Sequence, residues 1–439
     1  NRSSFLFPKV EFRYNRNLKA TIHIMKWLGF INLNLCAESC LILNSSTTVE
    51  MKMHSKLKKV PFGLFLMLLV FHFNPENLSA KSFGNFHPHH QSSLLADAEN
   101  GRILKNYQSE KTIYPASLVK MMVALITLEE IQKGKIHLND PIKVSKWASR
   151  IGGRQVYLKQ GEVFPLSEMM KAMVITSAND VTVAVAEHIS GDVNTFIQLM
   201  NKKAHLLGMN RTLFHSVHGL PPGRGQQFDR STANDLLKLS LELLKHPQYL
   251  NWASVRLDSF RNGTFQLLNT NHRLMRKYKG MDGMKTGYHR KGGFNLVATA
   301  KRNQRRFISI VLGAKSSRLR SKITRTLLDE GFQEYNQVRL DAQISMSPLS
   351  IEVDEGQETS LRLKTAHPLN VLLREKERMK VTHQFYLKDR INAPVKEGQK
   401  LGELEYRLEG KSLGRIPLIA EFGVKKAGLL TMFANSFFN

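Results

Sequence analysis

The spacing of apolar residues along the chain predicts helices in its middle and strands on either side. Residues 93–97 and 102–104 flank an Asn100-Gly101 turn and are expected to pair as strands. Between residues 116 and 245 apolar side chains recur at intervals of three and four, which is the spacing of an amphipathic helix. The expected helices lie at 116–134, where Met121, Met122, Leu125, Leu128 and Ile131 form one apolar face, within 166–189 as two helices broken near 176–180, and at 232–245.

The apolar period changes to two beyond Gly283. Three strands are expected at 283–288, 294–300 and 307–312, followed by a helix at 321–328. Strands, then helices, then a strand meander and a closing helix fit a sheet with helices on both faces and a helical subdomain. After Tyr335, short alternating runs with turn signals at Glu355-Gly356, Glu397-Gly398 and Glu409-Gly410 predict a small all-β domain over 337–422.

The segment 51–80 resembles a secretory signal peptide. Four lysines precede an unbroken apolar run at 64–71, and small residues at Ser79 and Ala80 offer a cleavage site. The run is too short to span a bilayer. We therefore expect translation to begin at Met51 or Met53, with residues 1–50 as upstream sequence. Both cysteines, Cys36 and Cys40, lie in that stretch, so the mature protein is expected to contain no disulfide.

Composition makes the chain globular and strongly basic. It has 439 residues, of which 42% are hydrophobic and 23% charged, a profile of two or three folded domains rather than of a disordered chain. Its formal net charge is +28, and residues 81–439 retain 54 basic and 32 acidic residues. Short basic clusters occur at 273–279, 301–306 and 315–325. The surplus is dispersed, without a zinc-ligand spacing or an RNA-binding aromatic motif, so we expect either a solvated basic surface or attraction to an anionic cell envelope, and not nucleic-acid binding.

The first chemical motif is the Ser-x-x-Lys sequence that begins at Ser117. A serine hydroxyl needs a base to become a nucleophile, and a spacing of three on a helix places Lys120 on the same face. Desolvation lowers the pKa of a lysine and lets it act as that base. The backbone N–H of Ser117 at the helix start could hold an oxyanion. By itself this motif is weak, because it also describes an exposed helix pair.

Two further motifs follow in the chain. Ser177 and Asn179, in the break between two helices, could relay a proton and hold a substrate amide. Lys285, Thr286 and Gly287 begin the strand meander, where a cationic and hydroxylic edge can bind a carboxylate and a glycine admits a ligand close to the backbone. The order of the three motifs, 60 and then 108 residues apart, is far more specific than any one of them.

With these motifs the chain resembles the low-molecular-mass penicillin-binding proteins that act as serine-type D-alanyl-D-alanine carboxypeptidases. The resemblance covers about 92–422 and includes His218-Gly219-Leu220 and Asn271-His272. One departure is Val119, where many relatives have threonine. The resemblance implies an α/β (α+β) fold of the serine β-lactamase and penicillin-binding class, with an antiparallel sheet flanked by helices over 81–335. The small all-β domain and an amphipathic membrane-anchor helix at 425–439 would follow it.

The resemblance also implies roles for the motif residues. Ser117 would attack the carbonyl between the last two D-alanines of a peptidoglycan pentapeptide, with Lys120 as its base. Ser177, Asn179 and Lys285 would help protonate the leaving D-alanine. The backbone N–H groups of Ser117 and Tyr288 would form the oxyanion hole, and Thr286 and Arg320 would hold the terminal carboxylate. β-Lactams would acylate Ser117, and neither a metal nor a cofactor would be needed.

Three other functions remain open from the sequence. A D,D-endopeptidase or transpeptidase would use the same acyl-enzyme with a different substrate or acceptor. A class A β-lactamase would need a glutamate with asparagine four residues on, and neither Glu187 nor Glu242 has one. A catalytically silent wall or membrane scaffold is the third. The expected location is the periplasm, on the outer face of the inner membrane, with residues 425–439 at the lipid surface.

Overall fold

The computed structural model describes residues 42–43, 49–50, 89–340 and 349–428. The chain divides into two compact units, Asn1–His87 and Pro88–Asn439. In the first unit the described residues are the strands β1 (Ile42–Leu43) and β2 (Val49–Glu50), which pair antiparallel. The signal-peptide segment 51–80, the expected start sites and both cysteines lie outside the described residues.

The second unit contains a five-stranded antiparallel sheet in the order β4-β3-β11-β10-β9. Its strands are β3 (Ser92–Asp97), β4 (Ile103–Tyr107), β9 (Met281–His289), β10 (Gly293–Arg302) and β11 (Arg305–Ala314). All five strands were expected from the sequence, and each of the last three is longer than its prediction. β9 lies at the edge of this sheet, which leaves its outer side available to the site described below.

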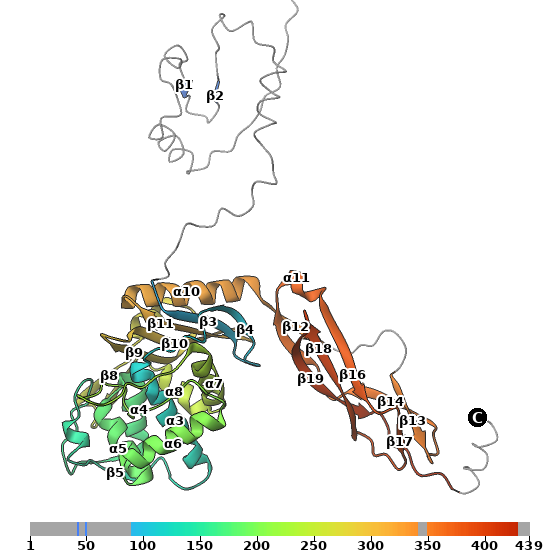
Figure 1. The fold of residues 1–439 in the computed structure, drawn as a ribbon, viewed down its shortest axis with the longest axis horizontal. Coiled ribbons are helices and arrows are strands. Elements are labelled where there is room, and N and C mark those ends of the chain that lie inside the picture. Colours follow the sequence, from blue (N-terminus) through green and yellow to red (C-terminus); the bar gives the residue numbers. More distant parts are fainter. Residues whose placement is uncertain (1–41, 44–48, 51–88, 341–348, 429–439) are drawn as a thin grey trace, which may run out of the picture. The chain divides into compact units, whose positions relative to one another are not determined.

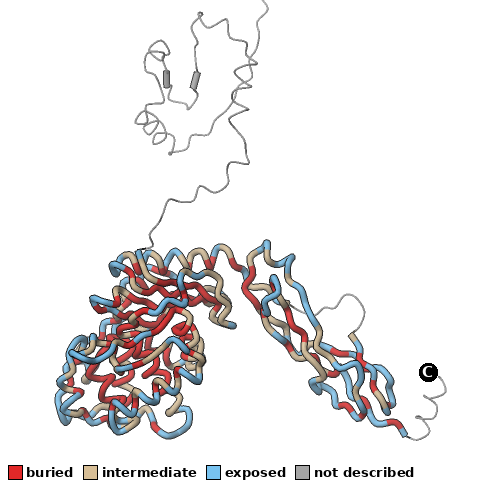
Figure 2. Tube along the Cα trace, viewed as in Figure 1, coloured by how far each residue is buried: buried red, intermediate tan, exposed pale blue. Residues whose placement is uncertain are grey.

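Side-chain alternation gives the sheet two buried faces. Leu94 and Ala96 of β3 pack with the helices of one cluster, whereas Leu95 between them belongs to a second cluster with Phe332 of the closing helix. That helix, α10 (Ser317–Glu334), packs on β10 and β11 (Figure 1). The other face is covered by α7 (Ala233–Leu244) and α8 (Pro247–Ala253). Helices on both faces of one sheet confirm the predicted architecture, and the buried residues concentrate there (Figure 2).

The helical subdomain is built around one central helix. Its elements are the 3₁₀ turn η4 (Ala116–Val119), α3 (Lys120–Gln132), α4 (Leu166–Thr176), α5 (Asn179–Ser190) and α6 (Val193–Leu206). The predicted break between α4 and α5 is confirmed. The amphipathic face expected for α3 is wrong, since every residue from Lys120 to Leu128 is buried. Val123, Ala124 and Ile126 are apolar too, so this part of the helix, up to Leu128, is enclosed on all sides.

Short elements complete the catalytic part of this unit. They are the hairpins β5 (Pro141–Lys143) with β6 (Val163–Pro165) and β7 (Leu257–Phe260) with β8 (Phe265–Leu268), the 3₁₀ turn η5 (Ala148–Arg150) and α9 (His272–Lys277). The helix predicted at 321–328 is instead the whole of α10, because Ser316 caps it by accepting a hydrogen bond from the Leu319 N–H.

The last described part is a mainly β domain with two cores of its own. Strands β12 (Asn336–Leu340) and β15 (Leu369–Leu373) pair, and a six-stranded sheet has the order β16-β18-β19-β14-β13-β17. Its strands are β13 (Ser350–Asp354), β14 (Ser360–Thr365), β16 (Val381–Leu387), β17 (Arg390–Asn392), β18 (Lys400–Leu408) and β19 (Lys411–Ala420), and one short helix is α11 (Glu375–Arg378). The turn expected at Glu409-Gly410 joins β18 to β19, with both residues at positive φ.

The expected anchor segment falls mostly outside the described residues. Its first four residues, 425–428, are not helical, because Lys426 forms a β-bridge with Gly356 and an ion pair with Glu355. The proposed helix therefore cannot begin before residue 429. Among the residues that the structure describes, no helix is long and apolar enough to cross a membrane.

Candidate active site

Ser117 lies in a tight turn that two other segments approach closely. It sits in η4, directly before α3, and the preceding Ala116 has a positive φ of 52°. A Cβ on Gly219 would lie 2.1 Å from the Ala116 carbonyl oxygen, and one on Gly287 would lie 2.5 Å from that of Pro115. Only glycine fits at either position, so these two glycines let a loop and the edge strand β9 pack against the nucleophile turn.

Lys120 occupies the centre of the site and touches three of its walls. Its Nζ lies 3.2 Å from Ser117 Oγ, 2.7 Å from Asn179 Oδ1 and 2.7 Å from the carbonyl oxygen of His218. The side chain is 2% exposed. The Ser-x-x-Lys spacing thus brings both side chains together through a 3₁₀ turn followed by the first residue of α3, and not through a continuous α-helix.

Burial is the main cause of the low pKa of Lys120. Desolvation lowers the pKa of Lys120 to about 7, and the charge of Arg154 acts in the same direction. Asp229 and Asp180 oppose this shift. Near pH 7 a substantial fraction of Lys120 is therefore the neutral amine, which can accept a proton from Ser117 Oγ.

The second motif forms the corner between α4 and α5. Ser177 ends α4 in the left-handed conformation with φ 68°, and its buried Oγ has no hydrogen-bond partner among the described residues. Asn179 begins α5, and its amide group joins Lys120 to the Gly152 carbonyl, 2.7 Å from Nδ2. Asp180 beside it accepts hydrogen bonds from the N–H groups of Val156 and Leu158, which fixes the loop containing Gly152.

The third motif lies on the edge strand β9. Lys285 is 3% exposed, and its Nζ donates to the Thr286 carbonyl at 3.0 Å. Burial, followed by the positive charges of Lys120, Arg154 and Arg320, holds the pKa of Lys285 well below its usual value. Thr286 Oγ1 donates to Thr270 Oγ1 at 2.7 Å. The site therefore brings several basic side chains close enough for their charges to act on one another.

The two remaining predicted residues, Tyr288 and Arg320, form no side-chain hydrogen bond to Ser117 or Lys120 within the described chain. The Tyr288 ring is 56% exposed and stacks on Phe294, so any part it plays at Ser117 belongs to its backbone. Arg320 is buried on α10; burial lowers its pKa to about 10, and its Nε has no partner among the described residues. Its charge acts on Lys285, but no hydrogen bond joins Arg320 to the other motif residues in the described chain.

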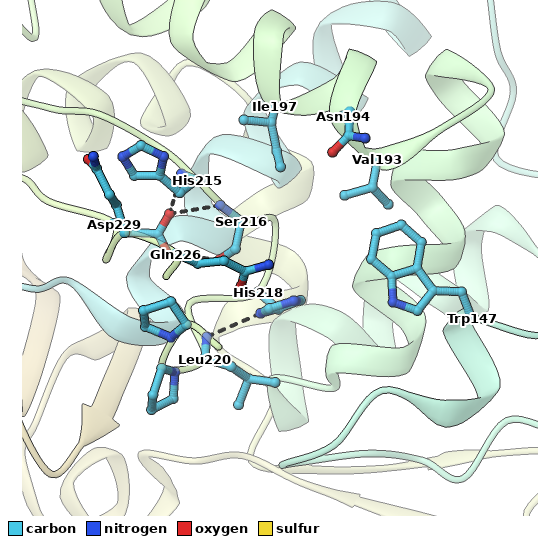
Figure 3. Close-up of a pocket in the computed structure, with 13 residues that line it drawn as sticks. Trp147, Val193, Asn194, Ile197, His215, Ser216, His218, Leu220, Gln226 and Asp229 are labelled. Carbon is cyan, nitrogen blue, oxygen red and sulfur yellow. Dashed lines mark hydrogen bonds between the residues drawn. The ribbon is translucent and has the colours of Figure 1, made fainter. Parts of the chain in front are cut away.

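The loop that carries His218 was recognised in the sequence only as a motif without a role. Asp229 accepts hydrogen bonds from the N–H groups of His215 and Ser216 (Figure 3) and from Ser216 Oγ. Ser216 Oγ itself accepts a hydrogen bond from the Gly219 N–H. This chain of bonds fixes the His218 carbonyl against Lys120. No local sequence signal marks Asp229, because it acts through bonds to residues 13 and 14 positions away.

Beside this loop is a cavity of about 430 Å³. Figure 3 shows Trp147 and Ile197 on its other side, facing His218 and Leu220 across the opening. His218 lines this cavity and its carbonyl contacts Lys120, whereas Ser117 and Lys120 do not themselves line it. Within the described ranges, no group of three or more His, Cys, Asp or Glu side chains is placed to hold a metal ion.

Two family models match the chain. Residues 80–316 match the model described as D-alanyl-D-alanine carboxypeptidase, and residues 341–426 match that of the penicillin-binding protein 5 C-terminal domain. The D-alanyl-D-alanine carboxypeptidase DacF of Bacillus subtilis is 35% identical over 345 residues, which cover 78% of this chain and 87% of that protein.

Solved structures resemble the chain over the same region. Penicillin-binding protein 5 from Haemophilus influenzae superposes with a TM-score of 0.66 at 28% identity, covering 77% of this chain and 98% of that one. Penicillin-binding protein D2 from Listeria monocytogenes, in its ampicillin-bound form, gives a TM-score of 0.52 at 30% identity, covering 57% of this chain and 99% of that one.

Proposed function

The chain belongs to the D-alanyl-D-alanine carboxypeptidase family, a family of serine-type hydrolases, and from this premise we propose that it removes the terminal D-alanine of peptidoglycan pentapeptides through an acyl-enzyme on Ser117. The contact between Lys120 Nζ and Ser117 Oγ, 3.2 Å apart, carries this proposal. It pairs a hydroxyl with a lysine whose pKa burial lowers to about 7, which is the pairing that acyl transfer by a serine requires.

In the first step the neutral amine of Lys120 takes the proton of Ser117 as Oγ bonds to the carbonyl carbon of the penultimate D-alanine. The carbonyl oxygen becomes an oxyanion and accepts hydrogen bonds from the backbone N–H groups of Ser117 and Tyr288. Support comes from the place of Tyr288 on β9, the edge strand that packs against η4. Asn179 and the His218 carbonyl keep Lys120 oriented throughout.

In the second step the carbon–nitrogen bond breaks and the leaving D-alanine takes up the proton held by Lys120. The unpartnered hydroxyl of Ser177 is available to pass this proton on, since it has no competing bond among the described residues. Water then attacks the ester, gives its proton to Lys120 and releases the shortened peptide. The returning proton restores the Ser117 hydroxyl.

The terminal carboxylate of the substrate is held by Thr286 and Arg320, with Lys285 nearby. Before substrate binds, burial and then the positive charges of Lys120, Arg154 and Arg320 hold the pKa of Lys285 well below its usual value. A bound carboxylate supplies the missing negative charge and raises that pKa, so binding is linked to uptake of a proton. This favours substrates that end in a free carboxylate.

β-Lactams are proposed to acylate Ser117 in the same way. Their ring amide opens on attack, but the leaving nitrogen stays tethered, so hydrolysis of the adduct is slow. The ampicillin-bound form of the Listeria relative supports this. A β-lactamase would need a deacylating glutamate, whereas Glu187 accepts from Ser145 and Glu242 pairs with Lys245 in this structure.

The experiment that tests the activity uses purified protein and a synthetic pentapeptide, with products followed by mass spectrometry. Loss of one alanine without a cross-linked product supports the carboxypeptidase. A cross-linked product, or cleavage only of cross-linked dimers, would replace it with a transpeptidase or an endopeptidase.

We further propose a periplasmic location, with the segment after Gly428 at the outer face of the inner membrane. Lys425 and Lys426 take part in the β domain through a backbone bond to Gln357 and the pair with Glu355, so a clean truncation should end at residue 428. That variant should keep its melting temperature and leave the membrane fraction. Membrane binding that survives the truncation would reject the anchor.

A further inference from the structure

A basic cleft lies between α9 and α10, next to the candidate active site, and it shares Arg320 with that site. Its volume is about 660 Å³. Five cationic side chains line it: Arg273 and Lys277 from α9, and Arg318, Arg320 and Arg325 from α10. Two basic clusters of the sequence, 273–279 and 315–325, thus meet across one opening, although some forty residues separate them in the chain.

The charge of this cleft is uncompensated within the described residues. No aspartate or glutamate lines it, and none of the five cationic side chains forms a salt bridge in the described parts of the chain. The third basic cluster behaves differently: its Arg302 pairs with Asp329 and its Arg306 with Asp282. Five basic side chains therefore converge on one opening whose lining contains no carboxylate.

A buried arginine in the cleft also lacks a partner. Arg320 is 8% exposed, and its Nε makes no hydrogen bond within the described chain. Burying an unpaired guanidinium costs free energy that a bound anion recovers. A carboxylate in the active site would engage at most two of its five N–H donors in a bidentate pair, so Arg320 can serve the cleft as well.

The backbone adds to this positive field. The cleft includes Ser317, the first residue of the 18-residue helix α10, where the helix dipole is positive. Ser321 lies one turn further on and contributes a hydroxyl. Helix N-termini flanked by arginines suit tetrahedral oxyanions, because their N–H groups converge on one point.

We propose that this cleft is a binding site for a multiply charged anion of the phosphate class. Five cations around one opening exceed the needs of a single carboxylate, and four of the five are arginines, which bind phosphate oxygens in pairs. The volume admits a group the size of a pyrophosphate. This proposal does not depend on the acyl-enzyme, and it gives a role to Arg273, Lys277, Arg318 and Arg325, which the proposed mechanism leaves unused.

The test measures binding of inorganic pyrophosphate to the full chain by calorimetry at two salt concentrations. The cleft variant carries Arg273→Gln, Arg318→Gln and Arg325→Gln together. The matched control carries Arg362→Gln, Lys364→Gln and Lys388→Gln, which remove the same charge from exposed positions of the β domain. If the triple variant does not fold, the single variant Arg318→Gln is used to measure the contribution of the cleft.

We expect one pyrophosphate site in the wild type and in the control, weakened roughly tenfold to a hundredfold in the cleft variant and measurably in Arg318→Gln. Equal affinity in the cleft variant and the control would overturn the proposal. So would a cleft variant that loses binding only to anionic phosphatidylglycerol vesicles, which would make the cleft a membrane contact. Labelling of Ser117 by a fluorescent penicillin, run in parallel, reports on the acyl-enzyme alone.

Discussion

The Nζ atom of Lys120 lies 2.7 Å from Oδ1 of Asn179, inside a site where burial lowers the lysine pKa to about 7. Asn179 accepts this hydrogen bond without adding a charge. The protonation of Lys120 is therefore set by burial and by charges at longer range. The pH dependence of acylation should report on this balance directly.

Replacing Asn179 by aspartate should move the pH profile of acylation to higher pH. In the wild type the rate of acylation by a β-lactam should rise with pH and level off above about 7, because only the neutral amine acts as a base. Asn179→Asp places a negative charge beside Nζ, raises the pKa of Lys120 and should move the midpoint up by about one unit or more. The control Asn201→Asp alters an amide that bridges two backbone groups of Phe214, away from Lys120. An unshifted midpoint in Asn179→Asp would contradict the assignment of Lys120 as base.

Removing the carboxylate of Asp229 should move the midpoint of the acylation pH profile to lower pH. The charge of Asp229 raises the pKa of Lys120, so Asp229→Asn should lower the midpoint by a fraction of a unit. The plateau rate should fall as well, because an amide cannot accept all three hydrogen bonds that Asp229 takes from His215 and Ser216. Stopped-flow acylation across pH separates the two effects. A lower plateau with a fixed midpoint would limit Asp229 to holding the loop.

The close approach of the His218 loop should make Gly219 irreplaceable. In Gly219→Ala the new methyl group would lie 2.1 Å from the Ala116 carbonyl, so the nucleophile turn must move, and acylation should fall about a hundredfold or more. Gly225→Ala is the matched control, since Gly225 also has a positive φ but nothing lies within 4 Å of its Cβ position. Gly225→Ala should lower stability by about 1 kcal/mol through backbone strain and leave acylation intact. Equal acylation in both variants would show that the contact does not position Ser117.

The orphaned hydroxyl of Ser177 should matter for turnover and not for folding. Ser177→Ala removes a buried group that has no partner among the described residues, so the free energy of unfolding should change by no more than about 1 kcal/mol. Turnover of pentapeptide should fall by about 10²-fold to 10⁴-fold if the hydroxyl relays the proton. Ser309→Ala removes another buried and unpartnered hydroxyl, on β11, and should leave turnover unchanged. Full activity of Ser177→Ala would exclude the relay.

Much of the fold was readable from periodicity, because the sheet alternates strictly between two buried faces. Leu94 and Leu95 on adjacent positions fill different cores, which is what a period of two encodes. The burial of α3 on all sides could not be predicted from the sequence. The apolar face that contains Met121 and Leu125 does not indicate whether Val123, on another face, is buried as well. That depends on which helices pack around it.

The site was predictable only where its residues fall in short motifs. Ser117 and Lys120 are three positions apart, so helical geometry alone brings them together. The contacts of Asp229 and of the His218 carbonyl depend on the path of a loop about one hundred residues downstream of Ser117. The path of this loop cannot be predicted from local sequence propensities. The His218 carbonyl cannot be recognised in the sequence either, because every residue has a backbone carbonyl.

The central claim is that Ser117 forms a covalent acyl-enzyme with Lys120 as its base. The most direct measurement is intact-protein mass spectrometry after brief exposure to benzylpenicillin, followed by peptide mapping, on the wild type, Ser117→Ala and Lys120→Arg. The account predicts one adduct of the mass of the drug, located on the peptide containing Ser117. It should be absent in Ser117→Ala and formed at least about a thousandfold more slowly in Lys120→Arg, whose guanidinium stays protonated. An adduct that persists in Ser117→Ala, or that maps to another residue, would contradict it.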